Sequence, residues 1–102
     1  MQTKFDWDPE KARSNLSKHG VAFTEAQTIF GDPGAFTVYD EEHSIDEDRF
    51  LSLGWSFEGN LLVVVHTDRV DDKGNDIWWI ISARQANRRE AKHYATQAKK
   101  RS

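Results

Sequence analysis

The chain has 102 residues, enough for one hydrophobic core and too few for two, so we expect a single domain over residues 1–102. It contains no cysteine, which excludes disulfides, thiolate metal sites and a cysteine nucleophile. Charged residues make up 30% of the chain, no apolar signal stretch follows Met1, and the longest apolar run, Leu61 to Val65, is far too short to cross a membrane. These features predict a cytoplasmic protein without membrane contact.

The net charge of -3 is unevenly distributed along the chain. Residues 1–48 carry eleven Asp and Glu against four Lys and Arg, whereas residues 49–102 carry six against ten. A protein that binds nucleic acid usually concentrates Lys and Arg on one face. The basic second half therefore permits RNA binding, although the acidity of the whole chain opposes nonspecific binding.

The first elements are predicted from local signals. Phe5 to Trp7 alternates apolar and polar residues, which favours a short strand. Asp8 followed by proline is a typical helix start, and Gly20 is a typical helix end, so a helix should run from Pro9 to His19. A capping-box pattern that begins at Thr24 predicts a second short helix over Glu25 to Phe30.

A sheet is predicted next, because four segments are rich in β-branched and aromatic residues and are separated by turn-like residues. In the second segment, Leu51, Leu53, Trp55 and Phe57 share one face, which we expect to be core. We expect an antiparallel meander of these four segments. They are Phe36–Tyr39, Arg49–Phe57, Leu61–Thr67 and Ile77–Ala83.

The chain should close with a basic amphipathic helix. A second capping-box pattern covers Asn87 to Glu90, and Ala91, Tyr94, Ala95 and Ala98 follow at helical spacing. The predicted fold class is therefore α+β, with two N-terminal helices and a C-terminal helix packed on an antiparallel sheet.

The segment from Asp40 to Asp48 is strongly acidic. Its carboxylates and His43 are residue types that bind divalent cations, which would make the chain a metal-dependent hydrolase. Like charges crowded in sequence more often form a solvated loop, because they repel one another. We prefer the loop and rank the metal-dependent enzyme last, so no metal site is assigned.

Generic enzyme motifs are absent from the sequence: it has no glycine-rich phosphate loop, no H-E-x-x-H pair and no G-x-S-x-G elbow. What remains is a set of cations at the ends of predicted elements. Cleaving RNA without a metal requires a base, fixed positive charge at the phosphate and an acid, and His, Arg and Lys can supply these. The candidate cations are Lys18, His19, Arg49, Arg84, Arg88, Arg89, Lys92 and His93.

Each candidate also has a structural explanation. Lys18 and His19 would stabilise the C-terminal end of a helix, and the cations of the last helix would form a solvated face. His66 lies in an apolar strand, which favours a hydrogen-bonded structural histidine. Arg84 is the exception, because a strand-to-helix junction often positions functional groups.

Two groups of residues, in order along the chain, resemble the BrnT family of toxins. The first group is Phe5-Asp6-Trp7-Asp8, Lys11, Asn15, Lys18-His19-Gly20-Val21, Phe23, Glu25-Ala26 and Phe30. The second group is Arg49, Leu61–Thr67, Ile80–Arg84, Ala86, Arg88-Arg89-Glu90 and Tyr94. The resemblance implies a RelE-like fold and the toxin of a type II toxin-antitoxin system, a metal-independent endoribonuclease that inhibits translation and uses no cofactor.

The resemblance also implies a partner and a site. The partner would be a BrnA-like antitoxin with a ribbon-helix-helix domain, and the toxin would reach DNA only through it. The matching cations, Lys18, His19, Arg49, Arg84 and Arg88, would line one RNA-facing cleft. Arg84 and Arg49 would clamp phosphate, His19 would act as base or acid, and Lys18 would supply charge. Glu58 is a weaker candidate for proton transfer, and Glu58, Arg89 and Lys92 are weaker candidates for RNA binding.

The chain departs from the family pattern at two places. Trp78-Trp79 stands where relatives tend to place an arginine, and residues 40–48 are unusually acidic. Both departures lower the expected RNA affinity. The alternative function is a catalytically weak or inactive module that binds its antitoxin and co-regulates the operon.

Overall fold

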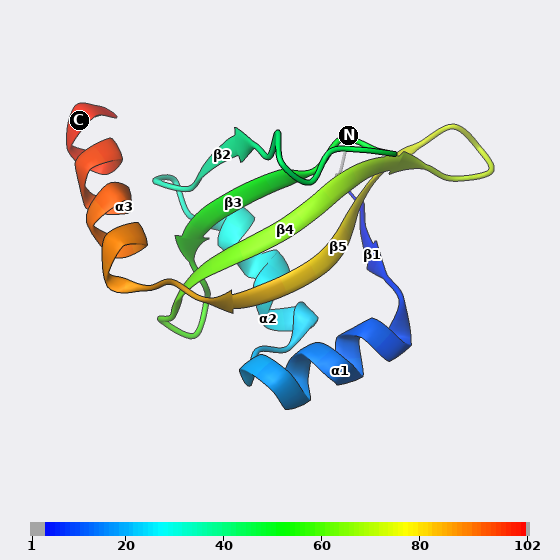
Figure 1. The fold of residues 1–102 in the computed structure, drawn as a ribbon, viewed down its shortest axis with the longest axis horizontal. Coiled ribbons are helices and arrows are strands. Elements are labelled where there is room, and N and C mark those ends of the chain that lie inside the picture. The colour runs from blue at the N-terminus through cyan, green and yellow to red at the C-terminus, as the bar shows by residue number, and fades with distance from the viewer. Residues whose placement is uncertain (1–3, 102) are drawn as a thin grey trace.

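The computed structural model describes residues 4–101 of the chain, which form one mixed sheet flanked by helices (Figure 1). The elements in chain order are β1 (Lys4–Trp7), α1 (Pro9–His19), α2 (Phe23–Ala26), the 3-10 helix η1 (Gln27–Gly31), β2 (Phe36–Tyr39), β3 (Phe50–Trp55), β4 (Leu61–Val70), β5 (Asp76–Gln85) and α3 (Arg88–Arg101). The α+β class and the four predicted sheet segments are confirmed, with shifted ends.

The sheet has the strand order β1-β5-β4-β3-β2. Strands β2 to β5 form the predicted antiparallel meander, but β1 pairs with β5 in parallel, from Lys4 beside Ile77 to Trp7 beside Ile80. The prediction of a wholly antiparallel sheet was therefore wrong. Since β1 leads into a helix and not into a hairpin, no tight turn fixes its direction, and it fills the open edge of β5.

Helix α1 has the predicted bounds. The Asp8 carboxylate accepts a hydrogen bond from the Glu10 N–H, and Gly20 adopts a left-handed conformation with φ of 71°. The Gly20 N–H donates to the Leu16 carbonyl and so closes the last turn. Both ends of the helix are thus defined by residues that the sequence identifies.

The second helix begins earlier than predicted and does not use the Thr24 capping box. Its cap is Ala22, which forms no side-chain cap bond, and the α-helical turn continues as a 3-10 helix to Gly31. This capping prediction was wrong because the helix already begins at Phe23, so Thr24 lies inside it and cannot cap its start. The Glu25 carboxylate accepts hydrogen bonds from Ser56 Oγ at 2.7 Å and Asn60 Nδ2 at 2.8 Å, at and after the end of β3.

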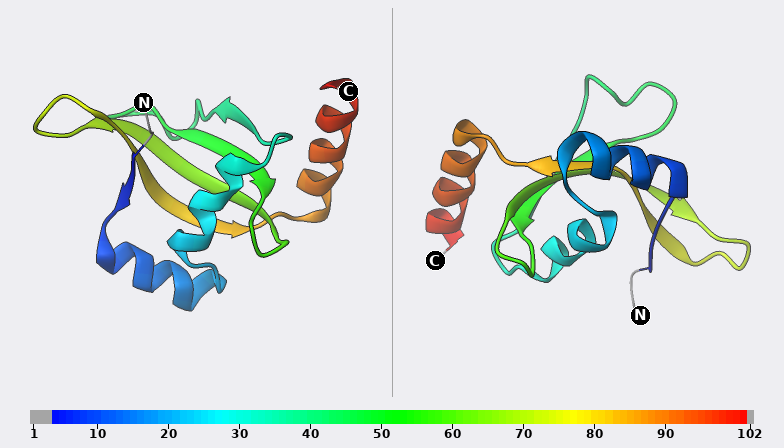
Figure 2. Two further views of the ribbon diagram at one scale, coloured as in Figure 1. Left: turned by 180° about the vertical axis from the view of Figure 1, so that it is seen from behind. Right: turned by 90° about the horizontal axis from the view of Figure 1, so that it is seen from below.

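The hydrophobic core lies between the N-terminal helices and one face of the sheet, hereafter the covered face (Figure 2). Its fully buried members include Ile29, Leu62, Val64 and Ile80. Gly54 belongs to this face, where a Cβ would lie only 2.9 Å from Ala35 Cβ and 3.3 Å from Ile29 Cβ. Glycine at this position allows η1 to approach β3 closely.

The predicted core face of β3 was therefore the wrong one. Trp55 and Phe57 are 46% and 91% exposed, whereas Ser52 and Ser56, on the opposite side, are buried. Small residues face the helices because they leave room for η1. Leu53 is buried all the same, on the second face of the sheet, hereafter the open face.

Helix α3 stands beside the end of the sheet where β5 finishes (Figure 1). The Tyr94 hydroxyl donates to Asp32 at 2.6 Å, and the Phe36 ring lies against the rings of His93 and Tyr94. No helix in residues 4–101 is long and apolar enough to span a membrane.

His66 is a buried structural histidine, as predicted. Its Nε2 lies 2.7 Å from Ser52 Oγ, and its ring stacks on Trp78 at 5.4 Å. Burial lowers the pKa of His66 below its usual 6.5, against an opposing influence from Asp68, so the ring is neutral at pH 7. Trp78 is therefore a packing residue on the covered face.

Candidate functional site

The junction between β5 and α3 holds Arg84 in a fixed position. Its Nη1 and Nη2 donate to the two oxygens of Glu90, both at 2.7 Å. These bonds, stronger than the opposing effect of burial, raise the pKa of Arg84, and the same contact lowers the pKa of Glu90. A bidentate pair of this kind fixes the guanidinium plane as well as its charge.

The Glu90 carboxylate has a second role at the start of α3. It accepts the Asn87 N–H at 2.9 Å, and the Asn87 side chain accepts the Glu90 N–H at 2.8 Å, which confirms the predicted capping box. One carboxylate therefore joins the helix start to the end of the strand.

Arg84 keeps some donors for a ligand. A guanidinium has five N–H groups, and Arg84 uses two on Glu90 and one on the Gln85 carbonyl at 3.3 Å. The remaining two have no partner among residues 4–101. The side chain can therefore bind a phosphate oxygen without leaving Glu90.

Three further cations lie on the first turns of α3. Arg88, Arg89 and Lys92 are exposed, and their side chains make no hydrogen bond or ion pair within the described chain. Arg88 and Lys92 are four residues apart and so share one side of the helix. Together with Arg84 they form the junction cations.

Asn15 brings the end of α1 to the same end of β5. Its Nδ2 donates to the Ala83 carbonyl at 2.8 Å and to the Val21 carbonyl at 2.9 Å, and its Oδ1 accepts the Ala83 N–H at 3.1 Å. Strand β1 pairs with β5 only as far as Ile80. Beyond that point the buried Asn15 amide takes the place of a neighbouring strand, because it hydrogen-bonds the backbone of Ala83. The sequence alone does not reveal this role, because the bonds of Asn15 to Ala83 join residues that are 68 positions apart.

Lys18 and His19 are exposed on the last turn of α1, as their helix-end positions predict. Their side chains have no partner in residues 4–101. Asn15 anchors this turn to Ala83, the residue before Arg84. Among the described residues no hydrogen bond or ion pair joins Lys18 or His19 to the junction cations.

Arg49 lies elsewhere on the open face. It directly precedes Phe50, which pairs with His66, whereas Arg84 is level with Leu53. Arg49 and Leu53 are four positions apart, which is roughly 13 Å in an extended strand. Arg49 and Arg84 therefore do not converge on one phosphate in this conformation.

The acidic segment surrounds Arg49. A hollow of about 250 Å³ is lined by Arg49, His43, Ile45, Asp46 and Glu47. The Arg49 Nε atom is buried there without a partner in the described chain. No group of three or more His, Asp or Glu side chains that could hold a metal ion is found in residues 4–101.

Two other residues considered from the sequence lie apart from the junction. Glu58 is exposed in the turn between β3 and β4, at a hollow of about 280 Å³ that it shares with Glu25 and Thr28. Trp79 lies under Arg69, whose guanidinium carbon is 4.3 Å from the ring centroid. The ring of Trp79 therefore already stacks on a cation of its own chain.

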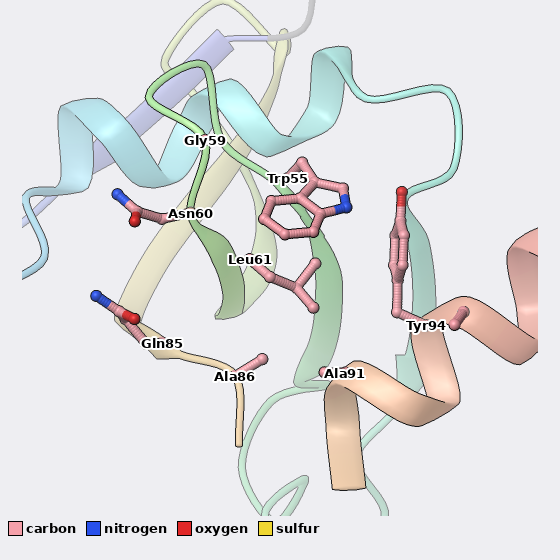
Figure 3. Close-up of a pocket in the computed structure, with 9 residues that line it drawn as sticks. Trp55, Gly59, Asn60, Leu61, Gln85, Ala86, Ala91 and Tyr94 are labelled. Carbon is pink, nitrogen blue, oxygen red and sulfur yellow. The ribbon is translucent and has the colours of Figure 1, made fainter. Parts of the chain in front are cut away.

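Sequence reasoning missed a cleft beside the junction. It has a volume of about 460 Å³ and opens between α3, the end of β5 and the turn between β3 and β4 (Figure 3). Its lining residues come from distant parts of the sequence, so no local motif signals it. They are Trp55, Gly59, Asn60, Leu61, Gln85, Ala86, Ala91, Tyr94 and Ala95.

Asp32 supports one wall of this cleft. Its carboxylate accepts hydrogen bonds from the backbone N–H of Trp55 at 2.8 Å, the Tyr94 hydroxyl at 2.6 Å and the backbone N–H of Gly34 at 2.9 Å. Burial opposes ionisation, but these bonds outweigh it and keep the pKa of Asp32 below its usual 3.8. An ionised aspartate thus holds both aromatic residues of the cleft in place.

The fold and the junction define a small α+β protein with the groups needed to bind a phosphodiester: fixed guanidinium donors and additional cations. Residues 7–90 match the family model described as "Ribonuclease toxin, BrnT, of type II toxin-antitoxin system". The chain therefore belongs to the BrnT family of type II toxin-antitoxin toxins, as its resemblance predicted.

A solved structure has the same fold. The crystal structure of the Brucella abortus ribonuclease toxin BrnT superposes with a TM-score of 0.63 at 20% sequence identity, and the match covers 85% of this chain and 100% of that chain. At this identity the likeness concerns the fold alone. The comparison with curated proteins gives no match.

Proposed function

We propose that residues 1–102 form one RelE-like toxin domain that cleaves RNA without a metal ion and thereby inhibits translation in the cytoplasm. The observation that carries the proposal is the Arg84 side chain, which Glu90 fixes while two N–H groups remain for a phosphate. Arg88 adds a cation without a partner in the described chain, one residue into α3. Membership of a ribonuclease toxin family supports the reaction class.

The proposed reaction is attack by a ribose 2′-hydroxyl on the adjacent phosphorus, with departure of the 5′-oxygen of the next nucleotide. Negative charge builds up on the phosphate oxygens in the transition state. Arg84 and Arg88 stabilise that charge, which is the largest effect that a site without a metal can provide. A base removes the 2′-hydroxyl proton, and an acid protonates the leaving oxygen.

His19 is the proposed base or acid, since an imidazole titrates near neutral pH. The hydrogen bonds of Asn15, which precedes His19 by four residues, to Ala83, the residue before Arg84, support this assignment. Lys18 supplies positive charge to the same region. Glu58, in the turn between β3 and β4, is the weaker candidate for proton transfer.

Arg49 is proposed to bind a different phosphate of the same RNA. Its position directly before β3, roughly 13 Å from the level of Arg84 along the strand, corresponds to a separation of a few nucleotides. Arg89 and Lys92 complete the binding surface on α3.

The proposed partner is a BrnA-like antitoxin with a ribbon-helix-helix domain, since a type II toxin is controlled by a protein antitoxin. The toxin contacts DNA only through that partner. An acidic toxin suits this arrangement, because the chain itself would be repelled by the DNA backbone.

A second candidate function is a catalytically weak module whose main role is antitoxin binding. One observation favours it: Arg84 already donates three hydrogen bonds within the chain, so its role at the junction is partly structural. The two functions differ in what happens when the chain is produced without its antitoxin.

Inducible expression of the chain alone tests the proposal. An active toxin arrests growth, and coexpression of the antitoxin restores it. Arg84→Ala and His19→Ala should abolish the arrest, whereas Arg13→Ala, which removes an exposed arginine paired only with Glu10, should not. Normal growth with folded parent protein at the same level would contradict the proposal and favour the binding module.

A further inference from the structure

The cleft beside the junction presents a half-exposed indole. Trp55 is 46% exposed, although Asp32 fixes its backbone and the Tyr94 ring meets it edge-on at a centroid distance of 6.4 Å. In Figure 3 the two aromatic side chains stand on one side of the cleft, and the amide groups of Asn60 and Gln85 point away from them. A rigid aromatic surface that faces an open cleft is suited to stack on a flat ring.

The two amides of the lining face away from the indole. Asn60 donates through Nδ2 to Glu25 of α2, and Gln85 pairs with Leu62, whose side chain belongs to the core of the covered face. Trp55 pairs with Leu61 on the open face, so the indole is the group that a ligand in the cleft contacts. Because the nine lining residues include no charged side chain, the cleft suits a neutral group and not a phosphate.

Cations nevertheless lie at the edge of the cleft. Arg84 directly precedes the lining residue Gln85 and donates to its carbonyl, and Arg88 is one helical turn before the lining residue Ala91. A ligand that places a neutral ring in the cleft and a phosphate at its edge would satisfy both regions. A nucleotide within an RNA strand has this composition.

We propose that this cleft binds one unstacked nucleobase of single-stranded RNA, which stacks on Trp55 beside Tyr94. The inference deepens the proposed function and rests on it, because the bound base would lie beside the phosphate held by Arg84. The cleft therefore contributes to the choice of cleavage site. Base-paired RNA does not fit, since its bases are stacked on their neighbours.

Binding of uncleavable RNA tests this proposal separately from cleavage. Nine-nucleotide, fluorescein-labelled, 2′-O-methyl single strands of each base are titrated with the protein in EDTA, and anisotropy gives the dissociation constants. Trp55→Ala should weaken binding of the preferred strand roughly 10-fold, the scale of one lost base stack. Trp55→Phe, which keeps a smaller aromatic ring, should recover most of the affinity.

Phe57→Ala is the matched control. Phe57 is two residues from Trp55 and 91% exposed, but it does not line the cleft, so its loss should leave binding unchanged. Duplex RNA should bind the parent and Trp55→Ala equally.

Three results would overturn the proposal. If Trp55→Ala and Trp55→Leu, both folded by circular dichroism, bind all four strands as the parent does, the cleft is not a base site. If these variants also cleave RNA at the parental rate, the proposed ribonuclease function stands without the base site. If these variants lose only antitoxin binding, the cleft belongs to the protein partner. If the parent binds no single strand and cleaves no RNA, both this inference and the proposed function are wrong.

Discussion

The two faces of the sheet differ in burial and in the side chains they carry. On the covered face, Leu62, Val64 and Ile80 have no exposed surface and pack against the N-terminal helical segments, which contribute the fully buried Ile29. The open face carries Arg49, Arg84 and a half-exposed Trp55. Stability is concentrated on one face, and the groups available to a ligand are concentrated on the other.

Strand β5 serves both faces at once. Ile80 and Ala83 are fully buried, yet Arg84, the residue after Ala83, carries the junction site. Side chains alternate along a strand, so one step along the chain moves from core to ligand surface. Anything that shifts β5 should therefore affect folding and function together, whereas changes to a single side chain should separate them.

The largest effect on stability is expected on the covered face. Ile80→Ala should lower the free energy of unfolding by about 2–5 kcal/mol, because it removes buried methyl and methylene groups and leaves a cavity. Val70→Ala, at a 66% exposed position, should change it by less than about 0.5 kcal/mol. Urea denaturation of both variants measures the difference, and equal losses would contradict the assignment of the faces.

A smaller loss is expected at the edge of β5. Asn15→Ala leaves the Ala83 N–H and the Val21 carbonyl without their partner, which should cost about 1–3 kcal/mol. Ser14→Ala, its exposed neighbour, provides the control. Hydrogen exchange at Ala83 should become faster in Asn15→Ala alone, and unchanged protection there would show that the amide does not complete the edge.

Acid should destabilise the protein in two stages. The pKa of His66 in the folded protein is lowered from 6.5, its value in the unfolded chain. Its contribution to the free energy of unfolding is therefore complete above pH 6.5 and is lost as the pH falls below that value. The pKa values of Glu25 and Asp32 are lowered from 4.5 and 3.8 despite partial burial, so their contributions are lost only in more acidic solution. His66→Phe should remove the first stage and leave the second, as followed by denaturation between pH 7 and 3; an unchanged first stage would assign it to another group.

The smallest effect is expected from the ion pair at the junction. Its side chains are 41% and 26% exposed, so solvent screens the attraction. Glu90→Gln should lower the free energy of unfolding by about 1 kcal/mol or less. A loss as large as that of Ile80→Ala would mean that the junction is part of the core.

Features with local signals were predicted well from the sequence. Asp8, Pro9 and Gly20 define α1 because caps act over a few residues, and the capping box of Asn87 and Glu90 was found for the same reason. The capping box at Thr24 failed because the helix begins one residue earlier, at Phe23, with Ala22 as its cap.

Features that depend on distant segments were not predicted. The parallel pairing of β1 with β5 joins residues more than 70 positions apart, and no turn between them signals it. The cleft combines Trp55, Gln85 and Tyr94 from three elements, so it exists only after folding. The cations at element ends were found because charge at such ends is visible in the sequence, but the placement of Arg49 away from Arg84 depends on strand register.

Cleavage of bulk RNA by the purified chain in excess EDTA tests the central claim most directly. The parent and Arg13→Ala should cleave, and Arg84→Ala should be inactive. Glu90→Gln, which weakens the same ion pair but keeps the arginine, should retain most activity if Arg84 acts on the phosphate. Equal losses in Arg84→Ala and Glu90→Gln would reduce Arg84 to a structural residue, and a folded parent that leaves RNA intact in EDTA would contradict the metal-independent ribonuclease.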